Sequence, residues 1–223
     1  MTRPDMQETD GRICVSIGEA GFAECMQLAA RLPLVEIRLD LMQLDPGKIE
    51  LLSLHCRQWI ATCRPGSYTE HDRMVQLSAA VRAGATYIDI EYEAEAGYRK
   101  ALTELAKRLG TQVIVSYHDF SATPDTGTLN GIIERSVEMG ADWVKIAVTA
   151  RSHADAARIM SLYGQDRRLI AFAMGRAGRI TRIAAPLLGA PFTFAAIDET
   201  RPTAPGQLTA AQMKMIFGIM DQP

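Results

Sequence analysis

The sequence lacks several features that mark particular classes of protein. Its four cysteines include no CxxC pair, so no zinc site is predicted, and we expect small buried thiols in a reducing compartment. No stretch of about 18 apolar residues occurs, which argues against a membrane-spanning helix. Residues 1–11, MTRPDMQETDG, form a polar extension with no hydrophobic segment behind it, unlike a signal peptide. We therefore expect a cytoplasmic protein that binds no metal.

Charge of one sign is not concentrated anywhere along the chain. The 24 lysines and arginines are balanced by 26 aspartates and glutamates, which gives a net charge of −2. Without a basic patch, neither nucleic acid nor an anionic membrane is expected as a partner. With 48% apolar residues, the chain of 223 residues can bury a large core, and no Pro/Gly/Ser-rich linker divides it. We therefore expect a single domain over residues 1–223.

Short β-branched runs alternate with helical patterns along the chain. The runs that predict strands are RICVSI (12–17), LVEIRLD (34–40), WIATCR (59–64), TYIDIEY (86–92), QVIVSYH (112–118), DWVKIAV (142–148), RLIAFAM (168–174) and PFTFAAI (191–197). Apolar residues at i, i+3 and i+4 predict helices over 19–32, 71–84, 94–110, 128–141 and 208–220. Strand starts about 26 residues apart imply parallel strands with helical crossovers.

We expect an α/β fold, a single (β/α)8 TIM barrel. An open doubly wound sheet is the alternative, but SIGEAG after the first run does not match the dinucleotide-binding pattern GxGxxG.

Alternation within the predicted strands places polar side chains on one face. The outward face of a barrel packs on helices and must be apolar, so the polar face points inward. The charged or titratable side chains expected there are Glu36, Arg38, Arg64, Asp89, Glu91, His118 and Lys145. Burying so many charges is unfavourable unless they pair with each other or bind a ligand. Because they lie toward the C-terminal ends of the strands, where barrel active sites form, we expect a functional site.

Lys145 is the residue that points most directly to chemistry. Inside a pocket, a lysine acts as a cation clamp or as a nucleophile, and its uncharged amine adds to a ketone to form an iminium ion that acidifies the adjacent C–H bond. Burial and the positive charges of Arg38 and Arg64 would favour the uncharged amine. His118, on the preceding strand, is expected beside Lys145 as general acid/base. Glu91 is expected to hold the imidazole in one tautomer.

Two late segments and the last helix complete the expectations from residue pattern. AMGRAGRITR (173–182) is predicted as a loop after the seventh strand that cradles an anion, either a phosphate or a carboxylate. ETRPTAPGQLT (199–209) is predicted as a structured loop over the barrel mouth, either a lid that excludes water or a plain connection. Four apolar residues of the last helix are expected in the core or on a dimer face: Met213, Met215, Phe217 and Met220.

Six segments follow, in order, the motifs of one known family. They are VEIRLD (35–40), TCRP (62–65), SYHDF (116–120) with TP close behind it (123–124), VKIAV (144–148), MGxxGxxxR (174–182) and APGQ (204–207). Each motif alone is weak, but together they cover almost the whole chain. In this combination the sequence resembles the type I 3-dehydroquinate dehydratases, the Schiff-base lyases of the shikimate pathway.

The resemblance implies roles for particular residues. Lys145 would form an imine with the ketone of 3-dehydroquinate, and His118 would be the general acid/base of a syn elimination of water that gives 3-dehydroshikimate. Arg182 would bind the substrate carboxylate, and Gln207 would close over the substrate from the lid. The remaining implied substrate contacts are Ser16, Glu36, Arg38, Arg64 and Thr203. The resemblance implies no metal or organic cofactor, a small-molecule substrate and, as often in this family, a homodimer.

The sequence departs from the family pattern at two positions. Thr203 and Ala173 stand where the family often has serine, which affects fine binding and leaves the covalent chemistry intact.

The residue pattern also allows two alternative functions. A class I aldolase would use the same lysine chemistry for C–C cleavage and would bind phosphate with the late glycines, whereas the side-chain fork of Arg182 suits a carboxylate better. A non-catalytic barrel that binds a polyhydroxylated acid would have no use for an amine beside an imidazole.

Overall fold

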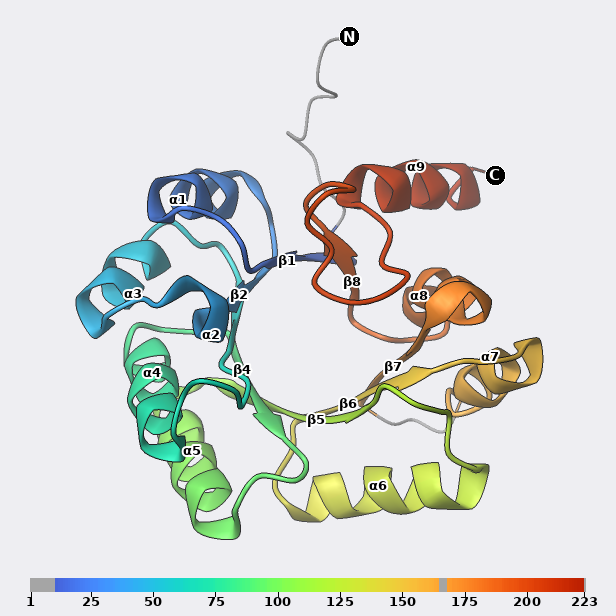
Figure 1. Cartoon of the computed structure of the whole chain (residues 1–223), viewed down its shortest axis with the longest axis horizontal. Helices are drawn as coiled ribbons and strands as arrows, with labels where there is room; N and C mark the ends of the chain where they lie inside the picture. The colour runs from blue at the N-terminus through green and yellow to red at the C-terminus, as the bar shows by residue number, and fades with distance from the viewer. Residues whose placement is uncertain (1–10, 165–167, 223) are drawn as a thin grey trace, which may run out of the picture.

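The chain forms parallel strands surrounded by a ring of helices (Figure 1). The computed structural model describes residues 11–164 and 168–222, so residues 1–10 of the predicted polar extension lie outside the described residues. The strands are β1 (Ile13–Ile17), β2 (Val35–Arg38), β3 (Trp59–Thr62), β4 (Tyr87–Glu91), β5 (Gln112–Asp119), β6 (Trp143–Thr149), β7 (Leu169–Met174) and β8 (Thr193–Ala196). The helices are α1 (Phe22–Arg31), α2 (Leu39–Met42), α3 (Pro46–Ser53), α4 (Glu70–Arg82), α5 (Ala96–Leu109), α6 (Thr126–Glu138), α7 (His153–Met160), α8 (Gly175–Leu187) and α9 (Ala210–Met220).

The strands pair into one 8-stranded sheet that nearly closes into a barrel. Their order is β7-β6-β5-β4-β3-β2-β1-β8, and the pairs are parallel. No ladder joins β7 to β8 within the described part of the chain, and at this seam the rings of Phe172 and Phe194 lie 5.7 Å apart between centroids. Side-chain contact therefore replaces backbone pairing at the seam, and the predicted TIM barrel is confirmed.

Each predicted strand overlaps an observed strand almost completely, but the helix predictions are incomplete. The five predicted helices correspond to α1, α4, α5, α6 and α9. The prediction of a loop over 173–182 is wrong, because β7 ends at Met174 and α8 begins at Gly175. Gly175 has φ = +80°, a conformation that glycine adopts without strain, and it turns the chain from strand to helix within one residue.

Local sequence explains where several helices begin and end. Thr69 and Asp72 form a reciprocal capping box at the start of α4, which satisfies backbone N–H groups of the first turn. Asp45 accepts a hydrogen bond from the backbone N–H of Lys48, and Pro46 occupies the first turn of α3. Gly110, at φ = +80°, ends α5 in the left-handed conformation.

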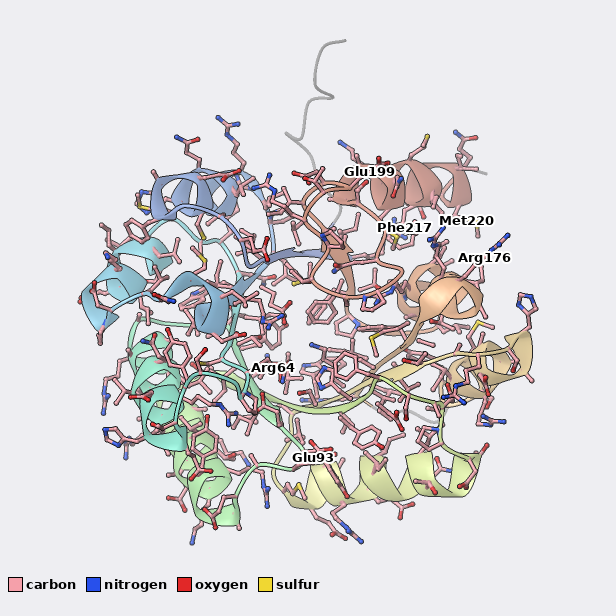
Figure 2. The ribbon with its side chains drawn as sticks, viewed as in Figure 1. Arg64, Glu93, Arg176, Glu199, Phe217 and Met220 are labelled. Carbon is pink, nitrogen blue, oxygen red and sulfur yellow. The ribbon has the colours of Figure 1, made fainter. Side chains whose placement is uncertain are left out.

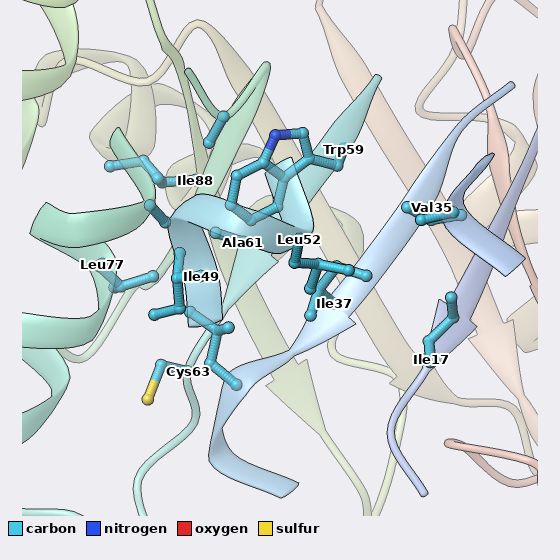
Figure 3. Packing of buried hydrophobic residues seen from close by; sticks show 14 of the residues in the cluster. Ile17, Val35, Ile37, Ile49, Leu52, Trp59, Ala61, Cys63, Leu77 and Ile88 are labelled. Carbon is cyan, nitrogen blue, oxygen red and sulfur yellow. The ribbon is translucent and has the colours of Figure 1, made fainter. Parts of the chain in front are cut away.

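Most of the core lies between the outward face of the strands and the helices. Figure 3 shows Val35, Ile37 and Ala61 of β2 and β3 packed against Ile49 and Leu52 of α3. These five residues are fully buried. The outward face is therefore apolar, as the alternation predicted.

The barrel interior near the N-terminal ends of the strands is also apolar, which the sequence analysis did not anticipate. A second layer of buried side chains fills it: Cys14, Leu34, Ile60, Ile114, Ile170, Phe192 and Phe194. The polar residues therefore occupy only the part of the interior that lies at the C-terminal ends of the strands.

The apolar residues of α9 divide between the core and the surface. Met213 and Phe217 are buried, whereas Met215 is 63% and Met220 is 55% exposed. Figure 2 shows Phe217 and Met220 on this helix, which covers one side of the barrel. Within the described residues, no helix combines the length and apolar character needed to cross a bilayer.

Candidate active site

A cavity of about 430 Å³ opens at the C-terminal ends of the strands. Its lining includes all ten residues for which the sequence predicted a catalytic or substrate-binding role: Ser16, Glu36, Arg38, Arg64, Glu91, His118, Lys145, Arg182, Thr203 and Gln207. Asp89, which was also expected inside the barrel, is fully buried and does not line the cavity. The lining also includes residues that the analysis missed, among them Glu93, Phe120, Phe172 and Phe194. Seven strands, helix α8 and the loop between β8 and α9 contribute to this lining, so the site exists only when the barrel is formed.

Lys145 lies inside the barrel on β6 and is only 4% exposed. Its Nζ donates to Asp89 Oδ2 at 3.0 Å and lies 3.7 Å from Glu36 Oε1. The same nitrogen lies 4.1 Å from the centroid of the Phe194 ring. Two carboxylates and the face of one aromatic ring thus surround the amine of the ligand-free lysine.

Asp89 is the shared acceptor at the base of the cavity. Burial alone would raise the pKa of this carboxyl group, but the nearby charges of Arg64 and Lys145 hold it well below its usual range. Arg64 donates to Asp89 at 2.7 Å, and the hydroxyl of Ser116 donates at 2.5 Å. Asp89 therefore stays ionised and holds both cations in place.

His118 lies on β5, the strand adjacent to Lys145 as predicted, but at a different level. In the register of β5 and β6, Lys145 pairs with Ser116, and His118 pairs with Ala147, two residues nearer the barrel mouth. The expectation of a direct lateral neighbour is therefore corrected. The imidazole lies in the layer above the amine, as an inward-facing residue two positions further along a strand must.

The environment of His118 keeps its imidazole neutral. Burial, together with the positive charges of Arg64 and Lys145, lowers the pKa of His118 to about 2. The ring stacks on Phe120, with centroids 6.1 Å apart and planes inclined by 11°. A neutral, oriented imidazole is suited to accept a proton and return it.

Glu91 does not contact His118 in the way that the sequence analysis expected. Its Oε1 accepts from Arg64 at 2.9 Å, and its Oε2 accepts from Arg73 of α4. No hydrogen bond joins Glu91 to His118 among the described residues. The partner of a long side chain depends on which groups the folded chain brings within reach, and here the carboxylate of Glu91 lies between the guanidinium groups of Arg64 and Arg73.

The three site arginines differ in what they bind. Arg64 donates to Asp89, Glu91 and Ser116, and Arg38 makes a bidentate contact with Asp40 at 3.0 and 2.6 Å. These guanidinium groups have their counter-charges within the protein.

Arg182 of α8 has none of its nitrogens paired among the described residues. It is 1% exposed, and its guanidinium carbon lies 4.5 Å from the centroid of the Phe172 ring. Burial lowers the pKa of Arg182 to about 10. A buried, unpaired guanidinium that lines a cavity forms a site for an anion.

Hydroxyl and amide groups surround the charged residues. The Ser16 hydroxyl donates to Glu36 at 2.6 Å. The backbone N–H and the hydroxyl of Thr203 donate to Gln207 Oε1 at 2.9 and 3.2 Å, within the loop between β8 and α9. Because both loop residues line the cavity, this loop lies over the mouth, in agreement with the lid interpretation.

The lid touches the start of α8 through two glycines. Gly206 has φ = +73°, and a Cβ atom on it would lie 3.0–3.2 Å from the backbone of Gly175. Only glycine fits this approach without displacing backbone. The lid therefore covers the N-terminal end of α8.

The cysteines offer neither a nucleophile nor a metal site. All four are free thiols, and burial raises the pKa of Cys25, Cys56 and Cys63 to about 12. Within residues 11–164 and 168–222, no group of three or more His, Cys, Asp or Glu residues has an arrangement that could hold a metal ion.

Comparison with known proteins agrees with this geometry. The profile of the type I 3-dehydroquinase family matches residues 13–223. The 3-dehydroquinate dehydratase of Desulfotalea psychrophila is 38% identical over 223 residues, covering 92% of this chain and 96% of the relative. The enzyme of the same name from Pyrococcus abyssi is 35% identical, covering 85% and 88% of the two chains.

Solved structures support the fold. The crystal structure of 3-dehydroquinate dehydratase from Geobacillus kaustophilus has a TM-score of 0.83 at 23% identity, covering 95% of this chain and 91% of that one. A deoxyribose phosphate aldolase from Aeropyrum pernix is similar at a TM-score of 0.59 and 16% identity, covering 95% and 90%. Identity this low shows the shared barrel alone, whereas the profile match and the closer relatives show that the chain belongs to the type I 3-dehydroquinase family.

Proposed function

We propose that this protein is a hydro-lyase that dehydrates 3-dehydroquinate to 3-dehydroshikimate through a Schiff base on Lys145. The observation that carries the proposal is the unpaired, buried guanidinium of Arg182, which shares one cavity with a buried lysine and a neutral histidine. The substrate offers a carboxylate for the arginine and a ketone for the amine. Family membership supports the same reaction.

Covalent chemistry begins at Lys145. The substrate displaces the contacts of the Lys145 amine with Asp89 and Glu36, the amine passes a proton to the neutral imidazole of His118, and its lone pair then adds to the ketone carbon. The imidazolium returns the proton to the hydroxyl of this adduct, which leaves as water and gives the protonated imine. The C=N bond withdraws electrons, so the C–H bond next to it becomes acidic.

His118 moves the proton of the elimination. Its neutral imidazole takes the proton from that acidified carbon, and the electron pair of the C–H bond becomes part of the new double bond. The β-hydroxyl group accepts the proton back from the imidazolium, its C–O bond breaks, and it leaves as water with the electron pair of that bond. Hydrolysis of the imine releases the product and regenerates the amine. Because the same imidazole takes the proton and returns it to the hydroxyl, both groups leave from the face of the substrate on which His118 lies, and the elimination is syn.

The remaining polar groups bind and orient the substrate. Arg182 receives the carboxylate in a bidentate contact. The lid holds Thr203 and Gln207 above the cavity, where they close over the bound molecule. The groups that face the hydroxyls are Ser16, Glu36, Arg38 and Arg64. Glu91 acts on this set indirectly, because its carboxylate holds Arg64.

Two observations disfavour the alternatives. In a phosphate-binding aldolase barrel, the start of a late helix is open to receive the phosphate, but here Gly206 covers the start of α8 at Gly175. A non-catalytic barrel that binds a polyhydroxylated acid would use the arginines without needing Lys145 in the layer below a neutral His118.

We further propose a cytoplasmic homodimer. Free thiols at all four cysteines are compatible with a reducing compartment. The exposed apolar side chains of α9, Met215, Ile219 and Met220, are 63%, 62% and 55% exposed and support a contact between two copies of the chain. Analytical ultracentrifugation of the wild type and of Ile219→Glu measures the assembly, and a monomeric wild type contradicts the dimer.

Reductive trapping tests the function. The wild type is incubated with 3-dehydroquinate, treated with borohydride and mapped by mass spectrometry, and the reduced adduct is expected on Lys145. Lys145→Ala should lose both the adduct and turnover, whereas Lys100→Ala, an exposed lysine of α5, should keep both. A parallel incubation with a sugar phosphate tests the aldolase alternative. Wild-type turnover by Lys145→Ala would disprove the mechanism.

A further inference from the structure

Arg73 is a buried cation that the reaction described above does not use. It lies on α4, is 6% exposed and is not part of the cavity lining. Its Nε donates to the Cys63 carbonyl at 2.9 Å, and its Nη2 pairs with Glu91. Its guanidinium carbon lies 5.1 Å from the centroid of the Tyr98 ring of α5. One guanidinium thus connects α4 to β4, to α5 and to Cys63, the residue that directly follows β3.

The polar contacts of Arg73 converge on Arg64. Cys63 directly precedes Arg64, so the hydrogen bond to the Cys63 carbonyl fixes the backbone from which Arg64 projects. Glu91 accepts from Arg64 Nη1 at 2.9 Å and from Arg73 through its other oxygen. The same guanidinium therefore holds both the main chain of Arg64 and its side-chain partner. Figure 2 shows Arg64 inside the ring of helices, and this residue lines the cavity.

Charges alternate along a continuous line of contacts from α4 to the reactive amine. The line runs through Arg73, Glu91, Arg64, Asp89 and Lys145, and each member pairs with the next. Without Arg73, Glu91 would keep one cationic partner instead of two. The guanidinium of Arg64 would then shift toward Glu91 and away from Asp89, because a carboxylate that loses one cation attracts the other more strongly.

We propose that Arg73, from outside the cavity, is the positioning residue that fixes Arg64 for its contact with the substrate, by holding both the Cys63 carbonyl and the Glu91 carboxylate. The inference rests on the proposed function, since it takes Arg64 as a substrate-binding group. A misplacement of about 1 Å in such a group lowers the rate by up to about a hundredfold.

Steady-state kinetics with matched variants test this role. Arg73→Met keeps an unbranched apolar chain and removes the donors, and Arg73→Lys keeps one cationic donor group. We expect roughly a ten- to hundredfold loss of kcat/KM for Arg73→Met, mainly through a higher KM, and a smaller loss for Arg73→Lys. Arg82→Met, at an exposed position of the same helix, should leave both constants unchanged.

A double-mutant cycle separates positioning from general structural support. If Arg73 acts through Arg64, then Arg73→Met should cause no further loss of kcat/KM in an Arg64→Met background. Multiplicative losses would overturn the inference, as would a folded Arg73→Met or Arg73→Lys with wild-type kinetics. If Arg73→Met does not fold, the cycle is run with Arg73→Lys.

A crystal structure of the ligand-free variant gives a readout that does not depend on activity. In Arg73→Met, which removes the cation, we expect the guanidinium of Arg64 to leave its position between Asp89 and Glu91. An unmoved Arg64 contradicts the inference even if the protein proves inactive on 3-dehydroquinate. Absence of wild-type turnover would instead refute the proposed function.

Discussion

The buried charge of Arg182 is expected to lower the free energy of unfolding of the ligand-free protein and to raise its affinity for the substrate. The variant Arg182→Met separates the two effects. Burial lowers the pKa of Arg182 from 12.5 to about 10. At about 1.4 kcal/mol for each pH unit, the buried charge destabilises the ligand-free fold by about 3 kcal/mol. The sign follows from the direction of the shift. The penalty is present in full below about pH 10 and disappears only as the pH rises from there toward 12.5, so it applies throughout the neutral range.

Removing the charge should therefore stabilise the protein. Methionine can pack on Phe172 as the guanidinium does, and we expect Arg182→Met to raise the free energy of unfolding by about 1–3 kcal/mol. For a chain of this length, Tm rises by about 2–4 °C for each kcal/mol. Urea unfolding at pH 7.5 measures the change. Arg179→Met, at an exposed position of the same helix, is the control and should show neither change.

Catalysis should change in the opposite direction. A substrate carboxylate bound without its counter-ion leaves an unpaired buried charge, which costs about 3–5 kcal/mol. This corresponds to a loss of about 10²–10⁴-fold in kcat/KM, measured by the absorbance of the conjugated product. A variant that is less stable than the wild type and binds substrate normally would show that Arg182 has a structural partner, and the reasoning would be refuted.

Two further predictions concern the imidazole and the lid. His118→Gln should lower kcat by about 10²–10⁴-fold with little effect on KM. The folded wild type keeps His118 neutral while the unfolded chain protonates below pH 6.5, so lowering the pH from 7 to 5 should destabilise the wild type by about 1–2 kcal/mol more than the variant. Chemical denaturation at both pH values measures this, and equal losses would contradict the assigned neutral state. His55→Gln, at an exposed position, is the control. Gly206→Ala should raise KM several-fold and cost about 1–2 kcal/mol, because its φ of +73° and its approach to Gly175 exclude a side chain. Gly218→Ala, with no atom within 4 Å of the added Cβ, should be neutral or stabilising, and similar KM values for the two variants would remove the argument for lid contact.

The sequence by itself determined the barrel and the membership of the site. Strand alternation places residues 36, 38, 64, 91, 118 and 145 on one face, and that face can only be the interior when the other face is apolar. The spacing of the strands requires parallel pairing, which brings their C-terminal ends to one rim. For these reasons these six residues line one cavity. Ser16, Arg182, Thr203 and Gln207, which line it too, were expected from the resemblance to the family.

Only the tertiary structure decided which of these groups are paired. Strand register raised His118 one layer above Lys145. Glu91 pairs with Arg73, a residue whose position on the buried face of α4 beside Leu77 and Ala80 is visible in the helical period, but whose reach to β4 is not.

Arg182 illustrates the reason for this division. Periodicity in a sequence specifies the face on which a side chain lies, because it depends on local backbone geometry. Ion pairing depends on distances between segments far apart in the chain, to within about an ångström, and these are set only when helices and strands pack. The absence of a partner for Arg182 among the described residues, on which the proposed binding of a carboxylate depends, is a property of the packed barrel alone.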